Sequence, residues 1–108
     1  MERKAVIHQG KQDKHIKGSN NFKQQLAQGK IPSILTADPH MLLLEGEGKG
    51  VRYIHNPNKE TVDFGRVIGQ YFDTNTELHI DTTRATIHYD ARGNAHIVPS
   101  MPSWMLED

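Results

Sequence analysis

The chain has 108 residues, of which 35% are hydrophobic and 24% are charged, and its basic and acidic residues balance to a formal net charge of zero. This length suits one domain with one core. The absence of cysteine excludes disulfides, thiolate metal sites and cysteine nucleophiles, and the longest apolar run, Met41–Leu44, is too short to span a bilayer. Residues 1–10 lack the apolar core of a secretory signal, so we expect a leader or linker there and a single domain over residues 11–108.

Charge is distributed unevenly along the chain. Residues 1–30 contain seven Lys or Arg residues and two acidic residues, which gives +5, whereas residues 31–108 contain six basic and eleven acidic residues, which gives −5. A molecule divided in this way can offer a basic face to phosphates despite its neutral sum. A solvated basic leader is the simpler explanation of the same distribution.

The first half of the chain predicts two short helices. Ser19 is a favourable N-cap for a helix that ends near Gly29. Asp38 followed by Pro39 predicts the start of a second helix, which contains the apolar run and ends near Gly46.

From residue 51 onward, short strand-like segments alternate with turn signals, and no helical pattern intervenes. Closely spaced strands of this kind predict an antiparallel meander. Gly65 and Gly69 indicate a bulge or bend in the longest segment. The predicted fold is therefore α+β, with short N-terminal helices packed on a twisted antiparallel sheet of about four strands. The strands are expected near residues 51–55, 62–72, 78–80 running into 82–89, and 95–98.

The segment that ends at Tyr89 has the most informative pattern. Strand alternation places Thr82, Arg84, Thr86 and His88 on one polar face, and the opposite face suits a hydrophobic core.

A hairpin is expected directly after this strand. A three-residue loop over residues 91–93, with Gly93 in the left-handed conformation, would bring His96 opposite His88. A change of one residue in the loop would move His96 to the other face of the sheet.

Imidazoles, a guanidinium and hydroxyls on one face form a suitable set for metal-free phosphodiester cleavage. One histidine can remove the proton of a ribose 2′-OH, another group can protonate the leaving 5′-oxygen, and a cation can stabilise the transition state. An ordinary solvent-exposed polar face remains the alternative. The seven histidines include no H-x-x-x-H or H-x-H pair, so a metal site has little support.

A second cluster lies in residues 11–19, where His15 is flanked by lysines just before a predicted helix start. Nearby positive charge lowers the pKa of a histidine and favours its neutral, basic form. The backbone N–H groups at a helix start favour anions. A basic loop with an exposed histidine is the simpler interpretation of the same residues.

Three blocks of the sequence, in their order and spacing, resemble the type 50 domain of bacterial polymorphic toxins. The blocks are KQDKHIKGSNNF, DFGRVIGQYF and TTRATIHYDARGNAHIVPSMP, and the resemblance covers about Lys11 to Pro102. That domain occurs at the C-terminus of large secreted effectors and of phage minor-capsid-like proteins. The resemblance implies a fold of the barnase/EndoU/colicin/RelE-like group, in which N-terminal helical elements pack on a small antiparallel sheet that holds the active site.

The resemblance also implies an activity, that of a metal-independent endoribonuclease that needs no cofactor and leaves a 2′,3′-cyclic phosphate. Delivered as the C-terminal part of a larger effector, such a domain acts on RNA, often tRNA, in the cytoplasm of the target cell. A dedicated immunity protein neutralises it, and no membrane partner is expected.

Transferred to this sequence, the family pattern implies that His15 and His88 serve as general base and acid, in an order that the sequence does not fix. Arg84 and Lys14 are expected to contact phosphate, and Thr82 to orient the phosphate or a histidine. The expected substrate-binding residues are Lys11, Lys17, Thr83, Thr86 and His96.

Two other functions fit the same residues. One is a non-catalytic module of a phage or effector structural protein that binds RNA or protein without cutting it. The other is a metal site built from scattered histidines. The enzyme differs from the binding module in whether Arg84, His88 and His15 converge on one phosphate.

Overall fold

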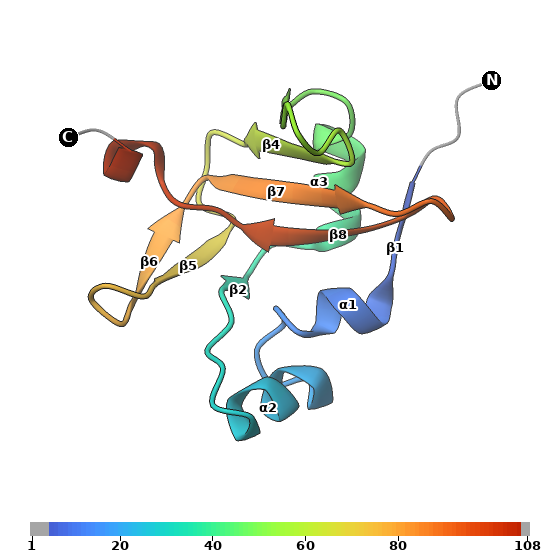
Figure 1. Ribbon diagram of the computed structural model, residues 1–108. Coiled ribbons are helices and arrows are strands. Elements are labelled where there is room, and N and C mark those ends of the chain that lie inside the picture. The colour runs from blue at the N-terminus through green and yellow to red at the C-terminus, as the bar shows by residue number, and fades with distance from the viewer. Residues whose placement is uncertain (1–4, 107–108) are drawn as a thin grey trace.

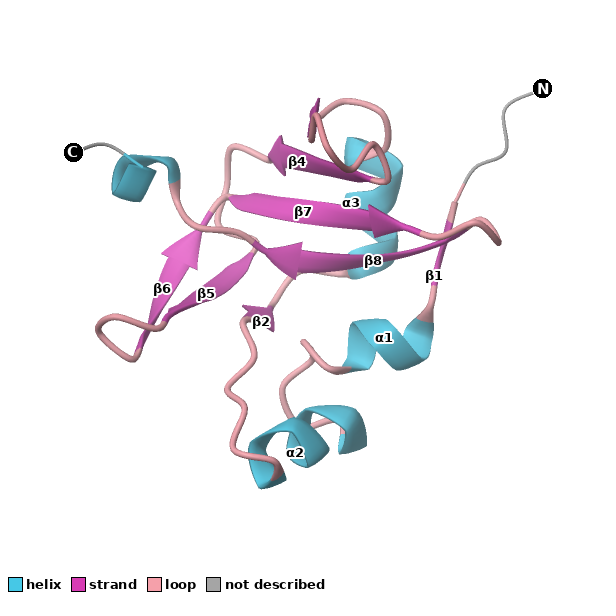
Figure 2. Cartoon of the chain, in the orientation of Figure 1, coloured by secondary structure: helices cyan, strands magenta, loops and turns pink. Residues whose placement is uncertain are grey.

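The computed structural model describes residues 5–106 and contains two β-sheets (Figures 1 and 2). No helix within those residues is long and apolar enough to cross a membrane. The larger sheet has the order β1 (Val6–Ile7), β8 (Asn94–Pro99), β7 (Arg84–Tyr89), β4 (Lys59–Asp63) and β3 (Val51–Arg52). The smaller sheet has the order β2 (Ile34–Leu35), β5 (Gly69–Asp73) and β6 (Leu78–Thr82). The helices are α1 (Gln9–Asp13), α2 (Asn20–Ala27), α3 (Pro39–Gly46) and the 3-10 turn η1 (Ser103–Leu106).

The two predicted helices, α2 and α3, form at their capping signals. Ser19 Oγ accepts a hydrogen bond from Phe22 N (3.0 Å) at the start of α2. The Asp38 carboxylate accepts one from His40 N (2.9 Å) at the start of α3. Pro39 occupies the first turn of α3, where the N–H that proline lacks would have no helical partner.

The short helix α1 was not predicted, because its five residues show no apolar periodicity. Its N-cap is His8, whose Nδ1 accepts a hydrogen bond from Lys11 N (3.2 Å). Gln12 in this helix is completely buried. Its side-chain Nε2 donates to Ile97 O (2.9 Å) and its Oε1 accepts from Ile97 N (2.7 Å). These two bonds attach α1 to the edge of β8.

Helix α3 covers one face of the larger sheet (Figure 1). Leu42 of the helix is fully buried in one cluster with the inward-facing Ala85, Ile87 and Ile97 of β7 and β8. Tyr89 packs against the edge of this cluster. The predicted core face of the 82–89 segment is therefore confirmed, and the opposite face of the sheet is left for the polar side chains.

The sheet arrangement differs from the predicted four-strand antiparallel meander. The segment expected as one strand over 62–72 is divided between β4 and β5, which lie in different sheets, and Gly65 between them has a φ of 72°. A bend at Thr83 likewise separates β6 from β7. The β5–β6 hairpin therefore leaves the main sheet, and β4 pairs directly with β7. The larger sheet is also mixed, because β1 is parallel to β8.

Part of the segment expected as a leader belongs to the fold. Val6 N donates to Gly93 O (3.0 Å) and His8 N donates to Ala95 O (2.7 Å), so residues 6–8 follow the edge of β8. The chain then turns directly into α1, which brings the basic N-terminal segment beside the β7–β8 hairpin.

Glu60 is a completely buried carboxylate on the core side of β4. It accepts hydrogen bonds from Gly48 N (2.8 Å), from Gly50 N (2.7 Å) and from the Tyr89 hydroxyl. Burial acts to raise the pKa of Glu60, but these hydrogen bonds outweigh burial and hold the pKa below its usual value. Glu60 therefore fixes the loop between α3 and β3 rather than serving the polar face.

Candidate active site

Two half-buried histidines stack on the face of the β7–β8 hairpin that points away from the core. His88 lies directly opposite His96 in the register, and the ring centroids are 4.7 Å apart with an interplanar angle of 10°. The turn closes through Asp90 N, which donates to Asn94 O (2.9 Å), and Gly93 has a φ of 83°. The predicted loop, register and histidine pair are all confirmed.

Both stacked histidines are neutral at neutral pH. Burial, followed by the positive charges of Lys59 and His15, lowers the pKa of His88 to about 4. Burial and the charges of His88, His15, Lys11 and Lys14 lower the pKa of His96 to about 4. Two stacked imidazoles also disfavour each other's protonation.

His15 completes a group of three histidines. Its Nδ1 lies 2.9 Å from Ser33 O, and because a carbonyl can only accept, Nδ1 carries the proton and Nε2 holds the lone pair in the neutral ring. Burial, together with the charge of Lys14, lowers the pKa of His15 despite the Ser33 hydrogen bond, which favours the charged form. The ring is thus oriented as a base.

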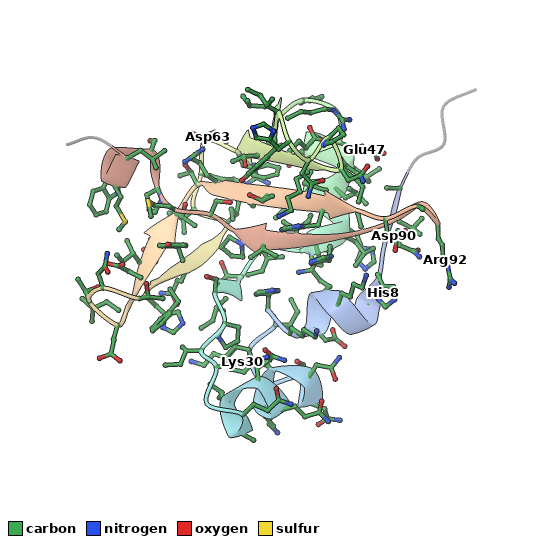
Figure 3. All side chains as sticks on the ribbon, viewed as in Figure 1. His8, Lys30, Glu47, Asp63, Asp90 and Arg92 are labelled. Atoms are coloured by element: carbon green, nitrogen blue, oxygen red, sulfur yellow. The ribbon has the colours of Figure 1, made fainter. Side chains whose placement is uncertain are left out.

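Lysines and a small pocket surround the histidines. A pocket of about 30 Å³ is lined by His8, Lys11, His88 and His96, among others. His8 lies at the start of α1, on the side of the molecule where Asp90 leads into the β7–β8 turn (Figure 3). Lys14 and Lys17 are exposed on the segment that follows α1. Of these two, Lys14 is close enough for its charge to affect His15 and His96.

The histidines form one end of a larger surface, which we call the polar sheet face. Side chains of β4, β7 and β8 that point away from the core, with Ser100 directly after β8, lie in three successive layers across the strands. The pairs between β4 and β7 are a lysine with a histidine, a threonine with a threonine, and an aspartate with an arginine. The layers are Lys59–His88–His96, Thr61–Thr86–Val98, and Asp63–Arg84–Ser100.

Hydroxyl groups connect the middle of the polar sheet face. Thr86 Oγ1 lies 3.0 Å from Thr61 Oγ1 and 2.6 Å from Ser100 Oγ. Tyr53 Oη lies 3.2 Å from Thr61 Oγ1, and Lys59 Nζ lies 5.8 Å from the centre of the Tyr53 ring. The hydrogen bonds to Thr61 and Thr86, with the charge of Lys59, lower the pKa of the Tyr53 hydroxyl. Thr86 itself is buried, which removes it from the expected substrate-binding residues. The accessible hydroxyls between the histidines and Arg84 are those of the exposed Tyr53 and the half-buried Thr61.

Arg84 is on the predicted face but two layers from His88. Because His88 follows Arg84 by four residues along the strand, their Cα atoms lie about 13 Å apart. Arg84 Nη1 donates to Met101 O (2.8 Å), which leaves most of the five guanidinium N–H groups available. Arg84 therefore marks the far end of the polar sheet face and does not share one phosphate with His88 and His15 in this arrangement.

Thr82 and Thr83 lie outside the polar sheet face. Thr82 is buried where the two sheets meet, and its hydroxyl donates to Ser100 O (2.7 Å) and accepts from Arg84 N (3.1 Å). Thr83 forms the bend, with its carbonyl accepting from Phe64 N (2.8 Å). The bend interrupts the alternation that had grouped Thr82 with His88. The role that the structure assigns to the Thr82 hydroxyl is to fix the junction of the sheets.

Sequence reasoning missed several residues of this surface, among them Tyr53, Lys59 and Thr61. The alternating pattern of KETVD, residues 59–63, contains the signal for the last two, but the predicted strand began at Val62. No sequence signal placed Tyr53, because the loop that carries it is positioned by tertiary contacts. Within residues 5–106, no group of three or more His, Asp or Glu side chains is arranged to hold a metal ion.

The fold and the site thus define a class of protein, a small α+β domain whose sheet carries histidines and lysines on one face. The family model described as bacterial toxin 50 matches residues 7–99, and the chain belongs to this family of toxin domains. The match includes the α1 segment, the whole of β7 and β8 up to Pro99, and all three central histidines. The comparisons with curated proteins and with solved structures found no match.

Proposed function

We propose that this toxin domain is a metal-independent endoribonuclease. The observation that supports this most directly is the grouping of His15, His88 and His96 with basic side chains at one end of the polar sheet face. Three imidazoles with lowered pKa values in one small region are typical of a site that transfers protons. Membership of a toxin family supports a harmful activity of this kind.

His15 is the proposed general base. Its Nδ1–H is held by the Ser33 carbonyl, so the lone pair on Nε2 is available for the 2′-hydroxyl proton of a bound ribonucleotide. Removal of that proton lets the 2′-oxygen attack the adjacent phosphorus. RNA supplies its own nucleophile in this reaction, so the protein needs neither a serine nor a cysteine.

His88 is the proposed general acid, with His96 as the stacked partner that shares its proton. A phosphate bound beside the pair adds negative charge and raises the pKa of both rings, so one proton is taken up with the substrate. That proton passes to the 5′-oxygen as its bond to phosphorus breaks. The products are a 2′,3′-cyclic phosphate and a free 5′-hydroxyl.

Lys11, Lys14 and Lys59 provide the positive charge near this end of the face. In the proposed mechanism they bind the phosphate and stabilise the extra negative charge of the transition state. Arg84 binds the substrate further along the strand, and Lys17 adds attraction for the RNA backbone at longer range.

Membership of the toxin family supports a biological setting for the proposed enzyme. The domain would be delivered as the C-terminal part of a larger effector and would act on RNA, with tRNA the first class to test, in the cytoplasm of the target cell. An immunity protein with an acidic surface would be suited to block the basic site.

The proposal is tested with an RNA oligonucleotide that the domain cleaves and with the same oligonucleotide carrying 2′-deoxyribose at the cleaved nucleotide. The mechanism predicts cleavage of the first, with a 2′,3′-cyclic phosphate end, and an intact second strand. Equal cleavage of both strands would overturn the mechanism. Binding of RNA without any cleavage would favour the non-catalytic module instead.

A further inference from the structure

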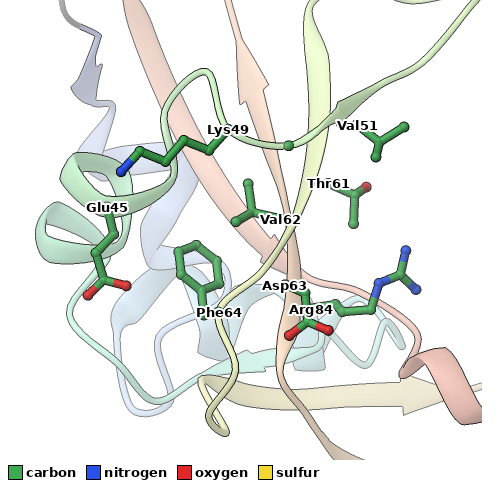
Figure 4. A pocket seen from close by; sticks show the side chains of 9 residues that line it. Glu45, Lys49, Val51, Thr61, Val62, Asp63, Phe64 and Arg84 are labelled. Carbon is green, nitrogen blue, oxygen red and sulfur yellow. The ribbon is translucent and has the colours of Figure 1, made fainter.

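An open cleft of about 540 Å³ lies at the end of the polar sheet face opposite the histidines (Figure 4). Val51 lines the cleft beside Thr61, whereas Val62, Phe64 and Lys49 line it on the α3 side of β4. Asp63 and Arg84, neighbours across β4 and β7, lie on its other side (Figure 4). The volume lies within the range of about 300–1,000 Å³ that is common for small-ligand sites. Of the residues that line this cleft, the mechanism proposed above uses Arg84 alone.

The charges in the cleft differ from those around the histidines. The cleft is lined by two carboxylates, Glu45 and Asp63, and two cations, Lys49 and Arg84. Glu45 is further engaged by Arg66, which forms hydrogen bonds of 2.8 and 3.0 Å with both of its oxygens. A planar group with apolar faces and hydrogen-bonding edges fits this mixture of carboxylates, cations and apolar side chains.

Asp63 gives the cleft a defined acceptor. One oxygen of its carboxylate accepts a hydrogen bond from Gly65 N (2.9 Å), and Gly65 has the positive φ that this tight turn requires. The Gly65 N–H, the Thr83 hydroxyl and the Arg84 charge lower the pKa of Asp63, which keeps it ionised. The exposed carboxylate still has free lone pairs, because two oxygens provide about four acceptor positions.

The cleft and the histidines are parts of one surface. Thr61 lines the cleft and is hydrogen-bonded to Thr86, which lies two residues from His88 on the same face of β7. The distance from His88 to Arg84 along the strand, about 13 Å, is of the order of two nucleotides of an extended single strand. A strand whose phosphate lies at the histidines can therefore place a neighbouring base in the cleft.

We propose that this cleft is the base-recognition subsite of the enzyme and that it accepts nucleobases with an exocyclic amino group (guanine, adenine or cytosine) in preference to uracil. Asp63 accepts a hydrogen bond from the amino group and Arg84 donates to the acceptors of the same base. The exposed Val51, which pairs with Thr61 on the same face, contacts the apolar face of the base. Uracil has no amino group, so it offers Asp63 fewer donors. The inference rests on the proposed ribonuclease function, but nucleotide binding tests it independently of cleavage.

The experiment titrates the four nucleoside 5′-monophosphates GMP, AMP, CMP and UMP into the isotope-labelled domain and follows its amide resonances by NMR. We expect shifts at residues 61–64 for GMP, AMP and CMP, with UMP binding about tenfold more weakly, the effect of one hydrogen bond to a charged group. Asp63→Asn should reduce this preference. Asp81→Asn, an exposed aspartate on β6 of the other sheet, is the matched control and should retain it.

Two results would overturn the subsite. One is a set of shifts confined to the histidines and equal for the four nucleotides, which would leave the ribonuclease proposal intact. The other is the absence of any shift at residues 61–64. Base-selective binding in the cleft together with intact RNA in the cleavage assay would support the subsite and contradict the ribonuclease. The two proposals therefore fail separately.

Discussion

The side chain of Gln12 makes both of its hydrogen bonds to the backbone of a single residue, Ile97. Nε2 donates to Ile97 O and Oε1 accepts from Ile97 N, at 2.9 and 2.7 Å, and the Gln12 side chain is completely buried. The amide thus serves as a one-residue extension of the sheet beyond β8. His15 lies three residues after Gln12, and His96 directly precedes Ile97. The contact between Gln12 and Ile97 therefore brings His15 and His96 to the same region.

Replacement of Gln12 by alanine should destabilise the domain by about 1–3 kcal/mol, since it leaves the buried N–H and C=O of Ile97 without partners. Urea unfolding followed by circular dichroism measures this loss. The matched control is Gln24→Ala, an exposed glutamine of α2, which should change stability by less than about 0.5 kcal/mol. Equal stability of the two variants would contradict the assigned role of Gln12.

The domain should lose stability as the pH falls from about 6.5 towards 4. The pKa of His88 and of His96 is lowered from 6.5 to about 4 in the folded state. In this interval the unfolded chain binds protons that the folded chain does not, so acid favours unfolding. The urea midpoint should therefore fall between pH 6.5 and 4, and fall less in His96→Gln.

The control for acid stability is His40→Gln, which changes an exposed histidine of α3 and should keep the wild-type pH dependence. A urea midpoint in the wild type that does not change over this range would show that the two rings are not protected from protonation.

The pH dependence of kcat/KM should have its maximum below pH 6.5. This quantity reports the ionisations of the free enzyme, and the pKa values of His15, His88 and His96 all lie below the ordinary value of 6.5. Lys59→Gln should shift the maximum to higher pH, because the Lys59 charge helps to lower the pKa of His88. Lys30→Gln is the control on an exposed loop. A maximum in the alkaline range would contradict the assigned acid and base.

RNA affinity should fall steeply with salt concentration. For a single strand, each phosphate neutralised contributes about 0.7 to the slope of log affinity against log salt. Lys11→Ala and Lys14→Ala should each reduce the slope by about that amount, and Lys23→Ala, an exposed lysine of α2, should change it less. Fluorescence anisotropy with a labelled RNA measures the slope. An unchanged slope in Lys11→Ala and Lys14→Ala would show that these lysines do not contact the phosphates of the RNA.

The local features of the site could be predicted from the sequence because short-range rules set them. The three-residue loop with Gly93 fixes the register that pairs His88 with His96, and alternation alone places Thr86 beside them. Capping residues likewise determine where α2 and α3 begin.

The long-range features could not be predicted in this way. The bend at Thr83 depends on the packing of two sheets, and it removes Thr82 from the polar sheet face. The pairing of β4 with β7 adds Lys59 and Thr61 to the polar sheet face. This pairing is long-range, because the β5–β6 hairpin lies between the two strands in the chain. The edge position of β1 arises from contacts between residues far apart in the sequence, which no local pattern encodes.

The most direct test of the central claim is incubation of the purified domain with total bacterial RNA, with and without EDTA, beside folded His88→Ala and His55→Ala variants. His55 is exposed on the β3–β4 loop and serves as the matched control. The account predicts discrete RNA fragments in EDTA, unchanged in His55→Ala and reduced by about 10²–10⁴-fold in His88→Ala. Cleavage that EDTA abolishes and added metal restores, or full activity in folded His88→Ala, would contradict it.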